Sequence, residues 1–386
     1  MMERDTSFAL IFALWAAGLG AAAQYGKVSV IFDMLPAVYP GSGAALGFVV
    51  SLVGFVGIVL GIVAGLLVAR IRYRRALLSA LWAGAALSLF QALLPALPLL
   101  LVSRIIEGAS HLAIVVAAPT LIAQLSAPKD RGLTLTLWGT FFGVAFAILT
   151  FAGRPLAVAL GPGALFAAHG VYMACCAMYL SSRLRRLPDD APQQPLSLAQ
   201  IWRDHGVIYR SPFLSAAAAG WLFYTFSFVS ILTVLPPFLD PGVRQLVMGA
   251  MPLTSIAVSM TLGVALLRRF PADGVVQAGF AGSLACAIWL WISPGAPLAC
   301  LALAGTMGLI QGASFATVAQ LNTTAAAQSR ANGAMAQMGN LGNTIGTPIM
   351  AAGLAGLGYA ALPIFAGGAF AAGLAAHLWL GMRRRA

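Results

Sequence analysis

The sequence predicts an all-α integral membrane protein of about twelve transmembrane helices, in two parallel six-helix repeats around a central cavity. Three observations predict this fold: the composition, the spacing of the apolar runs and an internal repeat. Of the 386 residues, 60% are hydrophobic and only 8% are charged, whereas a soluble domain carries roughly 25% charged residues. So few charges cannot cover a surface that faces water, so lipid must be the main solvent.

The apolar runs have the length of membrane spans. A spanning helix needs roughly 20 apolar residues, and windows of that size predict six helices on each side of one polar segment. The first six are predicted at 7–32, 43–69, 75–94, 97–125, 132–152 and 163–182. The second six are predicted at 212–236, 245–267, 272–293, 297–322, 330–355 and 359–382.

The basic residues predict the orientation. Lys and Arg concentrate in cytoplasmic loops, and a cytoplasmic N-terminus places 18 of the 22 basic residues in cytoplasmic segments. The external loops then hold only Arg154 and Arg244, while Lys27 and Arg104 fall within helices. The net charge of +12 is therefore explained by topology and not by nucleic-acid binding. We expect both termini in the cytoplasm and no cleavable signal peptide.

The long polar segment divides the chain into domains. It predicts an N-terminal six-helix bundle at 1–182, a cytoplasmic linker at 183–211 with one short amphipathic surface helix, and a C-terminal six-helix bundle at 212–386. The halves also share a motif: Glu107-Gly-Ala-Ser110 in the fourth helix matches Gln311-Gly-Ala-Ser314 in the tenth. A repeat with the same loop side positive in both halves indicates parallel bundles.

The chain resembles the major facilitator superfamily of secondary transporters over essentially its whole length. The six-plus-six arrangement of helices around a cytoplasmic linker and two motifs carry this resemblance. The loop Gly65-Leu-Leu-Val-Ala-Arg70-Ile-Arg-Tyr-Arg74-Arg75 is similar to the glycine-then-basic loop of that family, although Ala69 replaces its acidic residue and Arg72 its later glycine. Arg104-Ile-Ile-Glu107-Gly108 is similar to the Arg-x-x-x-Gly pattern of helix four. The Gly-Pro signature of drug antiporters in helix five is not clearly present.

The resemblance implies a secondary active transporter that moves a small organic solute by alternating access across a bacterial inner membrane. Proton-coupled export by an antiporter is the leading expectation, and import or uniport of an organic anion is the alternative. A non-transporting receptor or scaffold and a lipid-acting membrane enzyme are further alternatives. We expect no catalytic residues, no metal and no cofactor. The expected partners are the solute, protons and lipid, and the expected working unit is a monomer.

Arg104, Glu107 and His111 are the candidate coupling residues. Their spacing of i, i+3 and i+7 puts them on one stripe of helix four, and ionisable groups inside a bilayer are usually functional or paired. Glu107 could bridge Arg104 and His111, and exchange a proton when the solute or a conformational change breaks its pair with Arg104. A static ion pair with His111 filling the core is the alternative.

The resemblance also implies that helices one, four, seven and ten line the cavity. If Lys27 and Arg104 converge there, the solute is anionic or zwitterionic; otherwise Lys27 snorkels to the interface or pairs with Glu107. The remaining candidates are polar or aromatic residues whose alternative is to tie or pack helices. These candidates are Gln24, Trp221, Tyr224, Gln311, Ser314, Gln337, Asn340 and Thr344. Gly65, Arg70, Arg74 and Arg75 form a candidate cytoplasmic gate loop, with a positive-inside anchor as its alternative.

Overall fold

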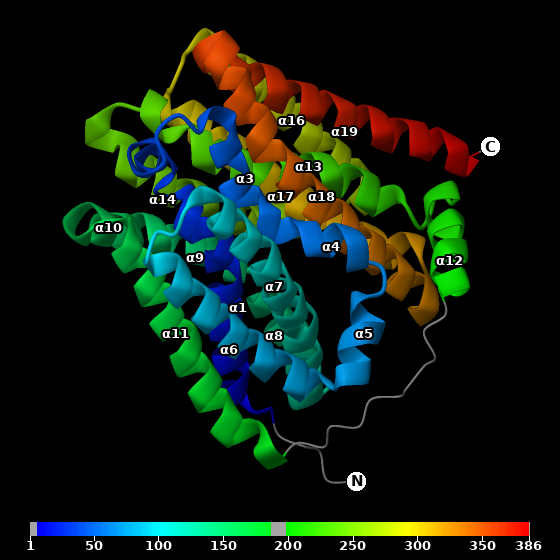
Figure 1. Ribbon diagram of the computed structural model, residues 1–386. Coiled ribbons are helices and arrows are strands. Elements are labelled where there is room, and N and C mark those ends of the chain that lie inside the picture. The colour runs from blue at the N-terminus through cyan, green and yellow to red at the C-terminus, as the bar shows by residue number, and fades with distance from the viewer. Residues whose placement is uncertain (1–5, 187–197, 386) are drawn as a thin grey trace. The chain divides into compact units, whose positions relative to one another are not determined.

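The computed structural model describes residues 6–186 and 198–385, and these residues form helices and turns without a strand (Figure 1). Eleven described segments are long and apolar enough to cross a membrane. The last of them, Ala326–Arg385, contains two helices, α18 and α19. Counting both gives the twelve predicted spans, and the all-α multi-pass membrane fold is confirmed.

Contacts divide the chain into two units. Unit 1 comes from the ranges 1–31 and 63–196, and unit 2 from the ranges 32–62 and 197–386. The predicted domain boundaries instead follow the chain, so 32–62 is the segment that the two divisions treat differently. Residues 187–197 of the predicted linker lie outside the described residues.

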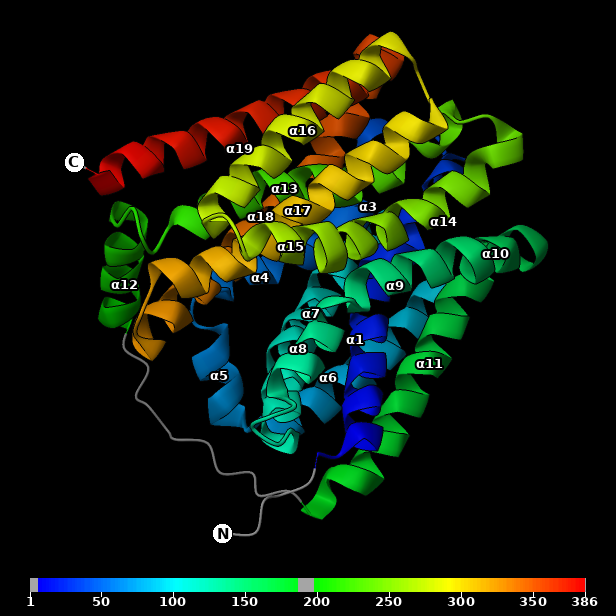
Figure 2. The ribbon, with the colours of Figure 1, turned by 180° about the vertical axis from the view of Figure 1, so that it is seen from behind.

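Unit 1 contains the N-terminal helices. Its elements are α1 (Phe8–Ser29), α5 (Ala64–Ile71), α6 (Tyr73–Ala92), α7 (Leu97–Leu125), α8 (Arg131–Gly139), α9 (Phe141–Ile148), the π-helical turn η4 (Leu149–Gly153), α10 (Arg154–Leu160), α11 (Pro162–Arg183) and η5 (Leu184–Arg186). Helix α1 contacts α7 and α11, and α6 contacts the same two helices (Figure 2). A buried apolar cluster that includes Ile11, Leu14 and Leu81 holds these four helices together along the N-terminal part of α1.

Unit 2 begins with short elements and continues with the C-terminal helices. The short elements are η1 (Phe32–Met34), α2 (Leu35–Val38), η2 (Gly43–Ala45), α3 (Leu46–Ser51), η3 (Leu52–Gly54) and α4 (Phe55–Leu60). The others are α12 (Leu198–Arg210), α13 (Ala216–Val234), η6 (Pro236–Phe238), α14 (Pro241–Val258), the π-helical turn η7 (Ser259–Gly263), α15 (Val264–Leu267), α16 (Ala272–Ile292), α17 (Pro297–Leu321), α18 (Ala325–Leu357), η8 (Gly358–Ala360) and α19 (Ala361–Arg385). Helix α12 lies within the range of the predicted linker, and its position at the membrane surface stays a prediction.

Helix α18 is the central packing element of unit 2, with α13 on one side and α3 and α4 on another. Glycines allow the close approach. A Cβ atom at Gly339 would lie 2.7 Å from Nε1 of Trp221 on α13, and a Cβ atom at Gly47 would lie 2.7 Å from Cα of Pro348. Membrane helices pack through such small residues because lipid provides no hydrophobic drive for their association.

Three sequence predictions about helix ends are wrong. The predicted helix 43–69 is interrupted at 61–63, where Gly61 follows Gly54 and Gly57 and helix propensity is low. The predicted helix 132–152 continues through η4 to Leu160, because Pro155 occupies the first turn of α10, where proline is tolerated. The predicted helix 245–267 begins earlier, at Pro241 of α14. Arg154 and Arg244, which the sequence predicts in loops, consequently lie in α10 and α14.

Candidate functional site

Four helices of unit 1 bring ionisable and amide side chains together in the interior. Helix α1 provides Lys27, α6 provides Gln91, α7 provides Arg104 and Glu107, and α11 provides His169. Lys27, Gln91, Arg104 and Glu107 are 0% exposed and His169 is 5% exposed. We call these five residues, together with Ser88 of α6, the polar cluster. Buried charges at membrane depth are costly unless they are paired, so the pairing within the cluster is the first question.

The ammonium group of Lys27 is surrounded by acceptors. Its Nζ donates to Oε1 of Glu107 and to Oγ of Ser88, both at 2.7 Å. It also lies 3.3 Å from Nδ1 of His169 and 5.2 Å from the ring centre of Phe166. Lys27 therefore pairs with Glu107, which was one alternative left open by the sequence. A lysine that snorkels to the interface would not be fully buried.

Glu107 receives hydrogen bonds from three helices. Lys27 donates to Oε1, whereas Arg104 and Gln91 both donate to Oε2, Gln91 at 2.8 Å. Arg104 also donates to the backbone carbonyl of Gln24. Glu107 is the one fully buried carboxylate among the described residues. It balances one of two neighbouring cations, so the cluster keeps one excess positive charge.

His169 and Ser88 were missed by the sequence analysis. Nε2 of His169 lies 2.9 Å from the carbonyl of Gly20, and donation to that carbonyl makes Nδ1 an acceptor. Nδ1 lies 2.8 Å from Oγ of Ser88, and the single hydroxyl proton of Ser88 can go to this nitrogen or to the carbonyl of Phe166 at 3.0 Å. A histidine inside a predicted span was the available signal, but no spacing on one helix connects it with Lys27. Only the packing of α11 against α1 does so.

His111 lies outside this hydrogen-bond network. Its Nδ1 lies 3.0 Å from the carbonyl of Ala21, and its ring meets the edge of Tyr25 with centres 5.1 Å apart. The hydrogen bonds from Arg104 therefore continue through Glu107 to Lys27 and not to His111. Gln24 lies nearby and donates to Ser110 at 3.0 Å, while its own Oε1 is buried without a hydrogen-bond partner among the described residues.

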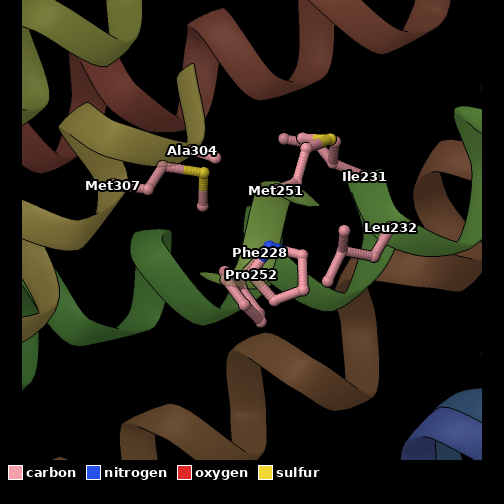
Figure 3. Close-up of a pocket in the computed structure, with 7 residues that line it drawn as sticks. All are labelled: Phe228, Ile231, Leu232, Met251, Pro252, Ala304 and Met307. Carbon is pink, nitrogen blue, oxygen red and sulfur yellow. The ribbon is translucent and has the colours of Figure 1, made fainter. Parts of the chain in front are cut away.

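The predicted cavity residues of α13 form an aromatic ladder in unit 2. Trp221 and Tyr224 stack with ring centres 4.6 Å apart, and Tyr224 stacks on Phe228 at 5.5 Å. Phe228 also lines a small apolar pocket between α13, α14 and α17 (Figure 3). The pocket is lined by Phe228, Ile231, Leu232, Met251, Pro252, Ala304 and Met307. None of the predicted cavity residues lines it, and the only hydrogen-bonding groups among its lining side chains are the weakly accepting sulfurs of Met251 and Met307.

The predicted polar residues of α17 and α18 have mostly local partners. Asn340 donates to the carbonyl of Ala336, and Thr344 donates to that of Asn340, so both bond within their own helix. Gln311 is half-buried. Oγ of Ser314 is buried and has no hydrogen-bond partner among the described residues. Gln337 differs, because its amide bonds to two other segments of unit 2.

The candidate gate loop joins α5 to α6. Gly65 and Arg70 lie in α5, while Arg74 and Arg75 begin α6, and Arg74 donates to the carbonyl of Arg185 at 3.3 Å. Arg72, which stands where the family pattern has a glycine, has φ 76° and ψ 130°. Residues other than glycine rarely adopt a positive φ, so Arg72 occupies a backbone conformation that favours glycine.

Comparisons with known proteins agree with the fold described above. The sequence profile of the Major Facilitator Superfamily matches residues 6–347. A crystal structure of the E. coli fucose:proton symporter FucP matches with a TM-score of 0.67 and 15% identity, over 96% of this chain and 98% of that one. Another FucP structure, in the outward conformation, has a TM-score of 0.68 and 14% identity, with the same coverage. A D-xylose-proton symporter has a TM-score of 0.73 and 15% identity, over 97% of both chains.

No curated protein matches the sequence. At these identities the solved structures establish the fold alone, whereas the family profile covers most of the chain. The profile, the twelve spans and the helical repeat agree with one another. The chain therefore belongs to the major facilitator superfamily and is a multi-pass membrane transporter of that family.

Proposed function

We propose that this transporter carries a small anionic or zwitterionic organic solute together with a proton, and that the polar cluster couples the two. The observation that supports this proposal is the fully buried pairing of Glu107 with Lys27 and Arg104. Protonation of Glu107 would remove the only negative charge between two cations. Both cations would then favour an anionic group of the solute as a replacement partner.

This linkage favours symport. Binding of the proton to Glu107 and of an anion to Lys27 would each make the other more favourable, because the two cations never remain without a counter-charge. Export by exchange, the leading expectation from the sequence, would instead need the solute and the proton to compete for one group. Transport direction follows the gradients of solute and proton, so it has to be measured.

The sugars named for the similar structures are not carried over to this chain. A sugar presents many hydroxyl groups, which need hydrogen-bonding partners once they are buried. The two buried cations of unit 1, Lys27 and Arg104, instead suit an anionic group. We propose a bacterial inner membrane as the location, with both termini in the cytoplasm, and a monomer as the working unit.

The test compares metabolites in cells and medium for the wild type, a deletion strain and a strain carrying Glu107→Gln. We expect an organic anion to remain in the medium of the deletion strain, and we expect Glu107→Gln not to restore its uptake against a gradient. The identified anion is then added to proteoliposomes that contain a pH-sensitive dye. Wild-type protein should acidify the lumen during uptake.

Two outcomes would overturn the proposal. If Glu107→Gln retains full pH-dependent uptake, Glu107 is a static ion-pair partner. An exported compound that accumulates inside the deletion strain would reverse the direction and support exchange. A Lys27→Met variant separates the roles further, since it should lower the affinity for the anion while Glu107 is kept.

A further inference from the structure

The amide of Gln337 joins three segments that are far apart in the sequence. Its Nε2 donates to the backbone carbonyl of Ile58 in α4 at 2.8 Å. Its Oε1 accepts from the hydroxyl of Tyr209 in α12 at 2.6 Å. All three segments belong to unit 2, and α12 lies beside α18 in both ribbon views (Figures 1 and 2). The side chain of Gln337 thus bonds α18 both to α4 and to α12.

The orientation of this amide follows from its partners. The carbonyl of Ile58 can only accept, so the nitrogen of Gln337 must face it. Nε2 of His205 lies 3.3 Å from the same nitrogen and can accept its second proton. Burial raises the pKa of Tyr209 to about 12, so its hydroxyl remains a donor at physiological pH. A flipped amide would lose these bonds.

Packing around the amide leaves little freedom. A Cβ atom at Gly61 would lie 2.7 Å from Cα of Gln337, and a Cβ atom at Gly333 would lie 3.3 Å from Cα of Ile62. On the other side Ile208 of α12 is 0% exposed and belongs to one apolar cluster with Ala331 and Ala334 of α18. The ion pair between Arg330 and Asp204 is partly exposed to solvent, so it contributes little to stability.

The position of the bonded segment in the chain gives this arrangement its significance. Residues 32–62 group with unit 2, although the residues before and after them group with unit 1. The helix is interrupted at 61–63, where this segment ends. A break in a helix is where backbone angles can change, so the bonds of Gln337 lie immediately before a potential hinge.

We propose that Gln337 is a clamp that makes α4 and the linker helix α12 move as one body with α18, and not a ligand of the solute. The clamp, together with the close packing of Gly61 and Ile62 on α18, confines bending to the chain that follows Ile62 and transmits any displacement of α12 to α4. It uses neutral hydrogen bonds and none of the arginines of the gate loop. This proposal is independent of the role of Glu107.

The test measures hydrogen–deuterium exchange of the full-length protein in detergent micelles, with three variants that divide the clamp. Gln337→Met removes both bonds, so exchange in α4 and α12 should rise together. Tyr209→Phe removes only the 2.6 Å bond to α12. Gln337→Glu keeps an acceptor for Tyr209 but loses the donor to Ile58 at 2.8 Å and the longer contact with His205 at 3.3 Å. We therefore expect Tyr209→Phe to loosen α12 alone, and Gln337→Glu to loosen α4 more than α12.

The expected size is a roughly fivefold faster exchange for each lost hydrogen bond. Gln328→Met is the matched control, because Gln328 on the same helix donates to the nearby carbonyl of Asn322. Unchanged exchange in α4 and α12 of Gln337→Met would overturn the clamp. Equal loosening of the distant helix α16 in that variant would also overturn it, since Gln337 would then support the fold in general.

Discussion

Helices α7 and α17 carry the same motif except at its first residue, and the two units use that residue differently. Glu107 is fully buried and bonded to Lys27, Arg104 and Gln91. Gln311, its counterpart, is half-buried. Repeat geometry thus places a side chain at the same point of two bundles, and its use depends on what the neighbouring helices present.

The surroundings of the two motifs differ in the same sense. Position 104 of α7 is an arginine, whereas position 308 of α17, at the same offset as the motif, is a glycine. A Cβ atom at Gly308 would lie 3.0 Å from Cα of Ser255, so α17 and α14 approach through their backbones. Around the motif, the helices of unit 1 are held together by charge pairing, whereas those of unit 2 are held together by close packing of neutral residues.

The largest expected effect is in unit 1. Glu107→Gln should lower the free energy of unfolding by about 3–5 kcal/mol, because Lys27 and Arg104 lose their counter-charge while buried. Gln311→Leu at the matching position should change it by less than about 0.5 kcal/mol. Denaturant unfolding of the purified protein in micelles, followed by tryptophan fluorescence, measures both. Equal effects would show that the charge asymmetry has no energetic weight.

Backbone packing in unit 2 gives the next effect. Gly346→Ala should cost about 1–3 kcal/mol, since its Cβ atom would lie 3.0 Å from the carbonyl carbon of Phe226 and closer still to the oxygen. Gly356→Ala, on the same helix with nothing within 4 Å of the added Cβ atom, should be neutral or stabilising. The same unfolding assay compares them. If the two variants were indistinguishable, α13 and α18 would not depend on glycine contact.

The loops after the second helix of each half provide a prediction of opposite sign. Arg72 has a φ of 76°, whereas Arg268 at the end of α15 has a φ of −74°. Arg72→Gly should therefore stabilise the protein by about 1 kcal/mol. Arg268→Gly should destabilise it slightly, because glycine loses more backbone freedom on folding. Thermal unfolding of both variants measures the difference, and a loss of stability in Arg72→Gly would contradict it.

The smallest effect on stability is expected at Thr344. Its hydroxyl bonds only to the carbonyl of Asn340 on its own helix, so Thr344→Val should change the free energy of unfolding by less than about 0.5 kcal/mol. If Thr344 is the cavity residue that the sequence predicts, the same variant should lower the apparent affinity for the solute roughly fivefold. Uptake kinetics in proteoliposomes decide this, and an unchanged KM would remove Thr344 from the site.

Much of the candidate site could be predicted on single helices but not across them. The spacing of Arg104 and Glu107 on one helix already indicated their ion pair, and it is present. The same spacing suggested that Glu107 also reaches His111, but the nearest acceptor for His111 is the carbonyl of Ala21 on α1. Periodicity places residues on a face of a helix; it does not say which group on the neighbouring helix is closer.

The sequence by itself determined the fold class, the number of spans and the presence of buried charge. These properties depend on the cost of polar groups in lipid, which can be read from the order of residues along the chain. The tertiary structure alone decided that His169 and Ser88 join Lys27, and that Gln337 bonds to Ile58 and Tyr209. Hydrogen bonds act over about 3 Å, so partners 61 to 279 positions apart become neighbours only when the packing of the helices brings their side chains together.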